Sequence, residues 1–461
     1  MRPSLLNNQE PTRLTKSPQT GCAFVSFDGG TKANSRLEQP DRYRYWNAAS
    51  MLRPGISRGA GLSYAAASFI DTGLSVSHAN FNRILGFDAK SRIVEVEAGI
   101  TLYALYRFLS QHNLYLPVQP GHGRITVGGC IAADVHGKNQ ARDGTFINQV
   151  ESLSLFHPSH GMLELSRESE PELFRLSCGG YGLTGNIIRA KLRASPIPAS
   201  LIQLSAVKFE EVQQGLQQLG EQAQNADFTY TWHDMASAGK KFGSGYLYIA
   251  NFVDDGVGRM PQPADTEAPE LTSKTRSAWP LGLLNAYSVH LLNTIYRYQQ
   301  KPILAGKLIT LEQALFPVHK AQLYFKLFGR RGFHEYQAIL PQDGLNEYLN
   351  MIEKYIRGEG LAISLASAKA FGGKPELLRF TGKGICFALN FPRTRSVEKL
   401  MPVLDNCLIT LGGRPNLIKD SRLPRAVLDA CYPGAEEFRS ILTNFDPKRL
   451  YRSELSTRLD L

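Results

Sequence analysis

The sequence lacks three features that would place it in common protein classes: long apolar runs, paired cysteines and an acidic excess. No stretch reaches the roughly 18 uninterrupted apolar residues of a membrane-spanning helix, so we expect no transmembrane segment. The six cysteines are scattered, with no CxxC pair and no histidines at zinc-ligand spacing, so we expect reduced thiols and no metal site. The first residues lack the apolar core of a signal peptide, and we therefore expect a cytoplasmic protein.

Acidic residues are outnumbered, with 41 Asp and Glu against 52 Lys and Arg and a net charge of +11. Such an excess favours an anionic partner: nucleic acid, a phosphorylated substrate or a membrane surface. We expect no nucleic acid, because the chain has no binding motif for it and no long basic run. The 43% hydrophobic and 20% charged residues are typical of a folded chain, and 461 residues predict more than one domain.

The pattern along the chain predicts three parts. Residues 1–200 form a first domain, in which a polar, irregular arm over residues 1–40 precedes strands and helices, such as a strand over 92–99 and a helix over 102–112. Residues 201–417 predict an antiparallel sheet with helices on one side. Residues 418–461 are charged and helical, and we expect them to return to the first domain.

Residues 120–139 carry the strongest functional signal. A glycine-punctuated loop leads into a run of small residues and ends on His136, Gly137, Lys138 and Asn139. Small side chains let backbone N–H groups approach a bulky anionic ligand, and the polar side chains that follow can face a reacting group. The alternative is an ordinary glycine-rich turn between strands.

Residues 180–185 read GYGLTG and match the G-x-G-x-x-G pattern of nicotinamide-binding folds. That motif should open a helix and be followed about 20 residues later by an acidic residue. Here a strand-like segment follows, and residues 203–207 contain no acid. We therefore reject nicotinamide binding at this segment.

Three glycine-bearing segments taken together, residues 58–64, 120–139 and 179–187, resemble the FAD-binding domain of the vanillyl-alcohol oxidase and p-cresol methylhydroxylase family. The likeness is closest to the branch that oxidises a polyprenyl-phosphoribose, and it continues through GFHEYQAILP, SAKAFG, GICFALNFP and IKDSR, from about residue 50 to the end. The resemblance implies an α+β fold with a PCMH-type FAD-binding domain and a substrate domain.

The resemblance also implies site residues. Those expected to bind FAD are Arg58, Gly59, Ala60, Gly61, Leu62, Ser63, Tyr64, Gly121, His122, Thr126, Gly128, Gly129, Ala132, His136, Gly137, Asn139, Gly182, Ile187 and Lys419. Those expected on the substrate side are Tyr64, Lys138, Gln337, Lys369 and Cys386, and the catalytic residues are Lys419 and His136. Cys386 also fits an inert thiol in a buried strand, and Lys369 and Lys419 fit ordinary surface lysines.

This chain departs from the family pattern at several of these places. Leu62 stands where covalently flavinylated members carry histidine, so the resemblance implies non-covalent FAD. Asn416 replaces a flavin-contacting tyrosine, Glu335 replaces a glutamine, and Ala65 and Ala66 replace a Gly-Asp pair. These changes leave the flavin site intact but weaken the inference about the substrate.

The family chemistry is hydride transfer from a carbinol carbon to the flavin, with a cation beside the flavin and an acceptor for the hydroxyl proton. Lys419 suits the cation, and His136 or a neutral Lys419 suits the acceptor. The implied reaction is oxidation of the 2-hydroxyl of a polyprenyl-phosphoribose, completed by a partner short-chain reductase to give net epimerisation for cell-envelope biosynthesis. The alternatives are an aldonolactone or sugar-alcohol oxidase, and a non-catalytic flavin- or anion-binding protein.

Residues 279–298 interrupt the domain pattern with a run rich in aromatic and aliphatic residues. Lys274, Arg276, Arg297 and Lys301 flank the run. Apolar residues with basic flanks can lie on an anionic membrane, so we expect peripheral contact with the inner face of the membrane. The alternative is a helix packed against its own domain.

Overall fold

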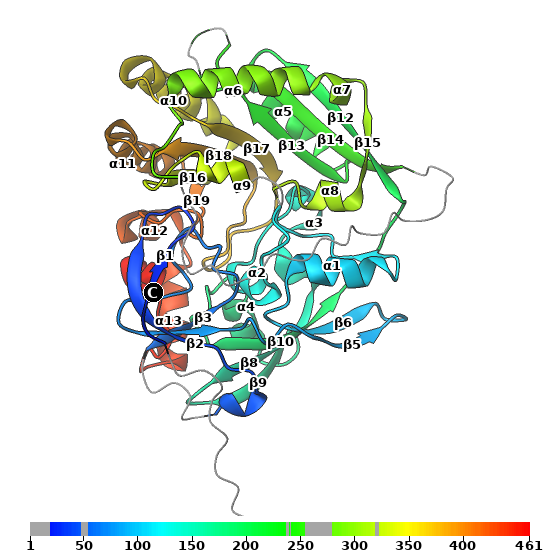
Figure 1. Ribbon diagram of the computed structural model, residues 1–461, viewed down its shortest axis with the longest axis vertical. Helices are drawn as coiled ribbons and strands as arrows, with labels where there is room; N and C mark the ends of the chain where they lie inside the picture. Colours follow the sequence, from blue (N-terminus) through cyan, green and yellow to red (C-terminus); the bar gives the residue numbers. More distant parts are fainter. Residues whose placement is uncertain (1–18, 48–53, 237–238, 240, 254–278, 319–321) are drawn as a thin grey trace, which may run out of the picture.

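The computed structural model describes residues 19–47, 54–236, 239, 241–253, 279–318 and 322–461 (Figure 1). Lys274 and Arg276 lie outside the described residues.

The chain begins with a four-stranded sheet in the order β1-β2-β4-β3, with β1 at Gln19–Val25, β2 at Lys32–Glu38, β3 at Gly55–Arg58 and β4 at Leu74–Ser77. The expectation of an irregular arm is therefore wrong for residues 19–38. Strands β1 and β2 pair with each other, and Cys22, Phe24 and Ala33 are buried against Phe69.

A five-stranded antiparallel sheet follows, in the order β5-β6-β10-β8-β9. Its strands are β5 at Ile84–Asp88, β6 at Ile93–Glu97, β8 at Val150–His157, β9 at Gly161–Ser166 and β10 at Asn186–Arg193. The helices α1 at Leu102–Ser110, α2 at Val127–Ala133, α3 at Gln140–Asp143 and α4 at Pro171–Ser177 accompany it. The short strands β7 at Leu114–Tyr115 and β11 at Ser195–Pro196 pair with each other. The strand expected over 92–99 and the helix expected over 102–112 are confirmed.

The largest sheet has eight strands, in the order β15-β12-β14-β13-β17-β18-β16-β19. These are β12 at Leu201–Phe209, β13 at Phe228–His233, β14 at Gly245–Val253, β15 at Lys307–Thr310, β16 at Phe333–Leu340, β17 at Leu365–Phe371, β18 at Gly384–Pro392 and β19 at Arg414–Pro415. Every adjacent pair of strands in this sheet is antiparallel.

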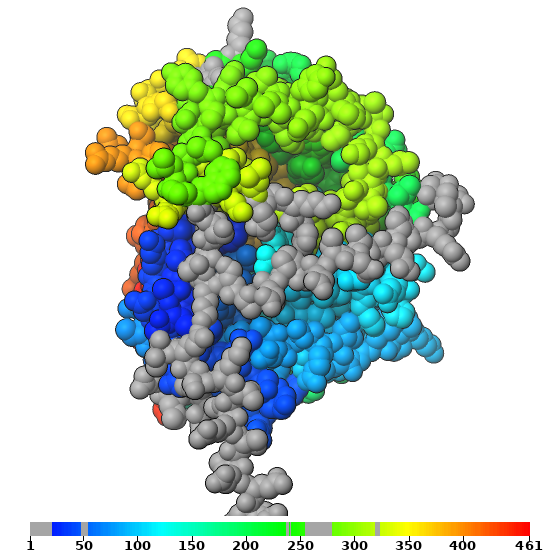
Figure 2. Space-filling view, viewed as in Figure 1, coloured from blue at the N-terminus to red at the C-terminus, as the bar shows by residue number. Residues whose placement is uncertain are grey.

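Helices cover the two faces of this sheet differently. Helices α5 at Val212–Gln222, α10 at Leu345–Glu359 and α11 at Arg395–Thr410 lie on one face, where Tyr336 of β16 reaches Asp405 of α11 and His233 contacts Phe209 and Phe387. The opposite face carries α6 at Ala286–Gln299, and α7 at Lys301–Leu304, α8 at Leu311–Leu315 and α9 at Gln322–Lys326 follow along the chain. The surface is hollowed below the light-green residues of α6 and α7 (Figure 2).

The C-terminal segment lies beside the first strands of the chain (Figure 1). It contains α12 at Arg425–Cys431, α13 at Ala435–Phe445 and α14 at Glu454–Leu459. The Gly55 amide donates to the Leu450 carbonyl at 2.9 Å, and the Glu454 amide donates to the Phe69 carbonyl at 2.9 Å. Among the described residues no helix is both long enough and apolar enough to cross a bilayer.

Candidate active site

The three glycine-bearing segments, distant in the sequence, meet in the structure. A Cβ added to Gly59 would lie 2.2 Å from the Oγ1 atom of Thr126, which places the first segment against the second. The Tyr181 amide donates to the Ala132 carbonyl at 2.7 Å, which ties the third segment to the second. A Cβ on Gly182 would lie 3.4 Å from Ile56, in the strand that leads into the first segment. The segments therefore form one continuous lining of small residues.

The first segment, residues 59–64, offers backbone donors. No described residue accepts a hydrogen bond from the backbone N–H groups of these six positions. Gly61 has a φ of +69°, and a Cβ there would lie 2.2 Å from the guanidinium of Arg58. That guanidinium lies 4.6 Å from the centre of the Phe24 ring and donates to Ser68 at 2.9 Å, and burial lowers its pKa to about 10. The free amides, together with the nearby arginine, suit an anionic group such as a pyrophosphate.

The second segment brings glycines and unsatisfied acceptors together. A Cβ on Gly128 would lie 3.0 Å from Ala98, so α2 packs directly on the residue after β6. A Cβ on Gly137 would lie 2.3 Å from the Oδ1 atom of Asn139 and 3.2 Å from the Gln119 carbonyl. Asn139 Oδ1 and Gln119 Oε1 are buried and find no donor among the described residues. Buried acceptors usually have a donor, so these two atoms are suited to a ligand that brings one.

The remaining positions expected to bind the cofactor lie around this lining. Gly121 is next to Val318, whose amide donates to the Gly121 carbonyl at 3.2 Å. His122 is buried, and its Nδ1 atom accepts from the Arg124 amide at 3.2 Å. Gly129 lies in the first turn of α2, whose N-cap is Thr126, and Ile187 is buried in β10.

Three residues expected on the substrate side come from three strands of the eight-stranded sheet. Lys369 of β17 is directly opposite Cys386 of β18. Cys386 is opposite Ile339 of β16, so Gln337 is two positions away on the same face. This face is the one opposite to α5, α10 and α11. Asn416 Nδ2 donates to Gln337 Oε1 at 2.6 Å and fixes that side chain.

Lys419, which follows β19, forms a triad with Glu335 and Tyr64. Its ammonium lies 3.9 Å from the centre of the Tyr64 ring and 3.3 Å from the Oε1 atom of Glu335. Burial disfavours the charged lysine, but the charge of Glu335 and the contact with Tyr64 outweigh it and raise the pKa of Lys419. Burial raises the pKa of Tyr64 to about 12, so the phenol stays protonated. Lys419 is therefore a fixed cation at neutral pH and not a proton acceptor.

His136 presents one free ring nitrogen. Its Nδ1 atom is 3.2 Å from the Gly137 carbonyl, and because a carbonyl only accepts, Nδ1 carries the hydrogen and Nε2 is left as an acceptor. The ring packs 4.8 Å from the ring centre of Phe371 and 5.8 Å from that of Phe380. Burial, followed by the charge of Lys369, holds the pKa of His136 well below its usual range, so the imidazole is neutral.

Lys138 and Lys369 add positive charge beside His136. The Lys138 ammonium lies 5.4 Å from the centre of the Tyr230 ring and donates to the Ala314 carbonyl. Burial and the charge of Lys369 lower the pKa of Lys138 to about 7. Burial also lowers the pKa of Lys369. The two lysines repel each other, and an anion between or beside them would relieve that repulsion.

Cys386 has the features of a protonated core thiol. It is 1% exposed and clusters with Ile339, Phe371 and Phe380. Burial raises its pKa to about 12, with Lys369 acting in the opposite direction. A thiol with this pKa carries little thiolate at neutral pH, and thiolate is the reactive form.

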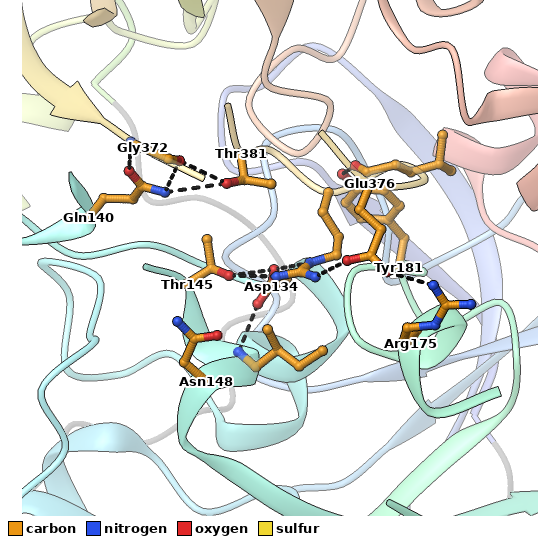
Figure 3. Close-up of polar contacts among 12 residues, drawn as sticks. Asp134, Gln140, Thr145, Asn148, Arg175, Tyr181, Gly372, Glu376 and Thr381 are labelled. Atoms are coloured by element: carbon orange, nitrogen blue, oxygen red, sulfur yellow. Dashed lines mark hydrogen bonds and ion pairs between the residues drawn. The ribbon is translucent and has the colours of Figure 1, made fainter. Parts of the chain in front are cut away.

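Sequence reasoning missed a second polar network, centred on Asp134 at the end of α2 (Figure 3). Asp134 is 1% exposed and accepts from the Arg379 guanidinium at 2.6 Å, from the Thr145 hydroxyl at 2.7 Å and from the Ile147 amide at 2.9 Å. Gln140 adds bonds to the Gly372 backbone. The network ties the segment that carries His136 and Lys138 to the loop between β17 and β18. Asp134 and Arg379 are far apart in the sequence and belong to no local motif, so nothing in the sequence indicated that they would pair.

Comparison with known proteins assigns this arrangement. A family model described as an FAD binding domain matches residues 45–166, which include the first two glycine segments. Decaprenylphosphoryl-beta-D-ribose oxidase of Mycolicibacterium smegmatis is 28% identical over 415 residues, covering 88% of this chain and 89% of that protein. The chain therefore carries a PCMH-type FAD-binding domain. The named relatives that match over this domain include oxidases and dehydrogenases, and this chain is an FAD-dependent oxidoreductase.

Two further relatives define the extent of the likeness. An uncharacterised protein of Streptomyces coelicolor is 28% identical over 381 residues, covering 78% of this chain and all of that protein. The L-galactono-1,4-lactone dehydrogenase 1 of Oryza sativa subsp. japonica is 36% identical over 189 residues, covering 40% of this chain and 32% of that protein. The likeness to the lactone dehydrogenase is therefore partial, whereas the first two relatives match across the chain.

The residues present fit FAD. A Cβ at Gly59 or Gly137 would collide with neighbouring protein atoms, so glycine at these positions lets the loops that line the site pack together. The amides of residues 59–64 would hold the pyrophosphate, and the acceptors of Asn139 and Gln119 would pair with donors of the ring system.

Proposed function

We propose that this flavoprotein oxidises the 2-hydroxyl of a polyprenyl-phosphoribose to a keto group. The observation that carries the proposal is the gathering of Lys138, Lys369 and Lys419 beside His136, because a sugar linked through a phosphate brings the anion that these cations attract. The keto product would pass to a short-chain reductase that returns a hydride to the opposite face, which gives net epimerisation. This role belongs to cell-envelope biosynthesis.

The similarity to decaprenylphosphoryl-beta-D-ribose oxidase supports the substrate class, since it spans 88% of the chain and so includes the sheet that carries Gln337, Lys369 and Cys386. The match to the lactone dehydrogenase covers 40% of the chain. An aldonolactone or sugar-alcohol oxidase on the same fold is the second candidate. Such a neutral substrate has no phosphate for Lys138 and Lys369 to bind.

The proposed mechanism assigns one role to each of three residues. Bound FAD would supply the hydride acceptor for the carbinol carbon. Lys419, kept charged by Glu335, supplies positive charge beside the cofactor and substrate. His136 is neutral and accepts the hydroxyl proton at Nε2, because its Nδ1 is occupied by the Gly137 carbonyl. Tyr64 covers the Lys419 ammonium and limits its contact with water.

We also propose that FAD is held without a covalent bond. Leu62 stands in the first glycine segment where covalent members carry histidine, and its aliphatic side chain cannot form a bond to the flavin. Acid precipitation of the purified protein should release all of the yellow colour into the supernatant. Colour that stays with the precipitate would contradict this proposal.

Anaerobic titration of the purified, FAD-loaded protein with a polyprenyl-phosphoribose tests the function. Bleaching of the flavin absorbance is expected, with the 2-keto sugar as product. A flavin band that persists with this substrate but bleaches with an aldonolactone would favour the second candidate. Lys419→Ala should lower the bleaching rate strongly while FAD stays bound. A protein that binds the flavin without turnover would show no such loss.

A further inference from the structure

Exposed apolar side chains gather on one surface of the molecule. They lie on α6, on the turn before it, and on α7 and α9: Trp279, Leu281, Leu283, Tyr287, Leu291, Leu292, Ile295, Tyr298, Leu304 and Leu323. Elsewhere in the described residues the large exposed apolar side chains are single and scattered, such as Leu85 and Met162. Scattered apolar residues are normal on a protein surface, whereas a continuous group of them indicates an interaction site.

Helix α6 is held on the sheet by its inward side, where Val289 is buried and Tyr296 packs on Trp232. The same side makes polar contacts: Asn293 donates to Asp234 at 2.7 Å and Arg297 donates to the same carboxylate at 3.0 Å. Its outward side carries Tyr287, Leu291 and Ile295, spaced at four residues as on one stripe of a helix, and Tyr287 is 89% exposed. Turning the helix over would bury apolar side chains but break the contacts with Asp234. The apolar stripe is therefore fixed outward and needs an apolar environment.

The charge around this stripe is positive. Residues 279–310 contain no Asp or Glu, whereas Lys301 and Lys307 are exposed beside it. The Lys301 ammonium lies 4.5 Å from the centre of the exposed Tyr298 ring. A second copy of the chain packed here around a two-fold axis would bring these like charges toward each other. An anionic lipid surface attracts them instead.

We propose that α6, α7 and β15 dock this enzyme on an anionic lipid bilayer, with α6 lying in the plane of the interface. Helix α6 has 14 residues, fewer than the roughly 20 needed to span a bilayer, so it lies on the membrane and does not cross it. The surface covers the side of the sheet that carries Trp232 and Tyr248 under α6, the same side as Lys369. A lipid-linked sugar would thus reach the site from the bilayer, a consequence that rests on the proposed function.

Vesicle sedimentation of the FAD-loaded, full-length enzyme tests the docking surface. We expect binding to vesicles of phosphatidylcholine mixed with phosphatidylglycerol, weaker binding to pure phosphatidylcholine, and loss of the difference at high salt. The double variant Leu291→Glu with Ile295→Glu should lower the apparent partition coefficient at least about tenfold, because two carboxylates replace apolar contacts and repel the lipid. The double variant Leu85→Glu with Met162→Glu adds the same charge elsewhere and should bind as the parent does.

The vesicles contain no substrate, so the result is independent of which sugar the enzyme oxidises. Flavin absorbance of each variant shows that the fold is retained. Equal binding by the two double variants, or no binding to anionic vesicles, would overturn the proposal. A dimer in analytical ultracentrifugation that Leu291→Glu with Ile295→Glu dissociates, without vesicle binding by the parent, would assign the surface to a second copy instead.

Discussion

At the scale of single residues, Glu335 decides the charge of Lys419. Its carboxylate is nine-tenths buried and lies 3.3 Å from the ammonium. The sequence offered a neutral Lys419 and His136 as alternative proton acceptors. The contact with Glu335 removes the first of these, because it raises the pKa of Lys419. His136 is left as the proposed proton acceptor.

The substitution Glu335→Gln removes the charge that raises the pKa of Lys419, while burial continues to lower it. A lysine is charged below its pKa, so the alkaline fall of kcat/KM should move to lower pH. Above that pH, each unit of pKa lost lowers activity about tenfold. The pH profile of kcat/KM checks this, with Glu347→Gln, on the exposed surface of α10, as the control. An unchanged alkaline limb would show that Lys419 need not be charged.

Lys138 should make the binding of an anionic substrate depend on pH near neutrality. Its pKa is lowered to about 7 by burial and by Lys369, so the free enzyme loses this charge as pH rises through 7. We expect kcat/KM for a phosphate-bearing sugar to fall several-fold between pH 6 and pH 8, because about 10% of Lys138 remains charged at the higher pH. Lys138→Arg should flatten the profile, since arginine stays charged.

A neutral sugar or aldonolactone is the matched comparison, because its binding gains little from the charge of Lys138. Parallel pH profiles for the neutral and the anionic substrate would contradict the assignment of Lys138 to phosphate binding. Values measured at saturating substrate should show less pH dependence, because the bound anion raises the pKa of the lysine.

At the scale of elements, the cofactor site depends on loops that pack closely enough to exclude side chains. Gly59 precedes β4 in the chain and Thr126 caps α2, and the two loops touch where a Cβ has no room. Thr126 cannot rotate away at low cost, because it is β-branched and its hydroxyl accepts from the Gly129 amide at 3.3 Å. Glycine is therefore required at position 59 because Thr126 leaves no room for a Cβ, and not because of the backbone angle φ.

Gly59→Ala should weaken FAD binding, because the added methyl group forces the first two glycine segments apart. Overpacking of this kind costs about 1–3 kcal/mol, which corresponds to a loss of affinity of roughly fivefold to 150-fold. Quenching of flavin fluorescence on titration into the flavin-free protein measures it. Gly220→Ala in α5, where a Cβ meets nothing within 4 Å, should leave the affinity unchanged. Equal FAD affinities of the Gly59→Ala and Gly220→Ala variants would show that the two loops can move apart without weakening FAD binding.

At the scale of the whole molecule, the candidate site is built from three parts of the chain that are separate in the sequence. The cofactor segments come from residues 58–187, the substrate-side residues from strands of the eight-stranded sheet, and Lys419 from the segment that returns to β3. The Asp134–Arg379 pair joins two of these parts, with side chains 0% and 12% exposed. Because this ion pair holds the two parts together, it fixes the distance between His136 and Lys369.

Arg379→Met should lower the stability of the protein by about 3–5 kcal/mol, because it leaves the Asp134 carboxylate buried without its partner. Arg379→Met combined with Asp134→Asn should recover part of that loss. Arg425→Met breaks an ion pair with Asp460 whose side chains are 51% and 67% exposed, and should change stability by less than about 1 kcal/mol. Urea unfolding midpoints of the three variants check this order, and equal midpoints would contradict it.

The sequence by itself determined the cofactor and much of the local structure. Alternation and helical spacing located β6 and α1, because these patterns follow from backbone geometry alone. The run of small residues over 120–139 indicated a cofactor loop, because small residues are needed where a ligand approaches the backbone. The polar residues 19–38 gave no such signal, and their two strands follow from pairing with each other and from the pairing of β2 with β4.

Only the tertiary structure decided which charges meet. Glu335 and Lys419 are 84 positions apart, Asp134 and Arg379 are 245 apart, and neither pair has a local pattern, so their protonation and their partners follow from the fold. The outward direction of the apolar stripe on α6 was likewise open in the sequence, which allowed a packed helix or a membrane contact. The inward contacts of Asn293 and Arg297 with Asp234 show which side of α6 faces its own sheet, and the membrane contact stays a prediction.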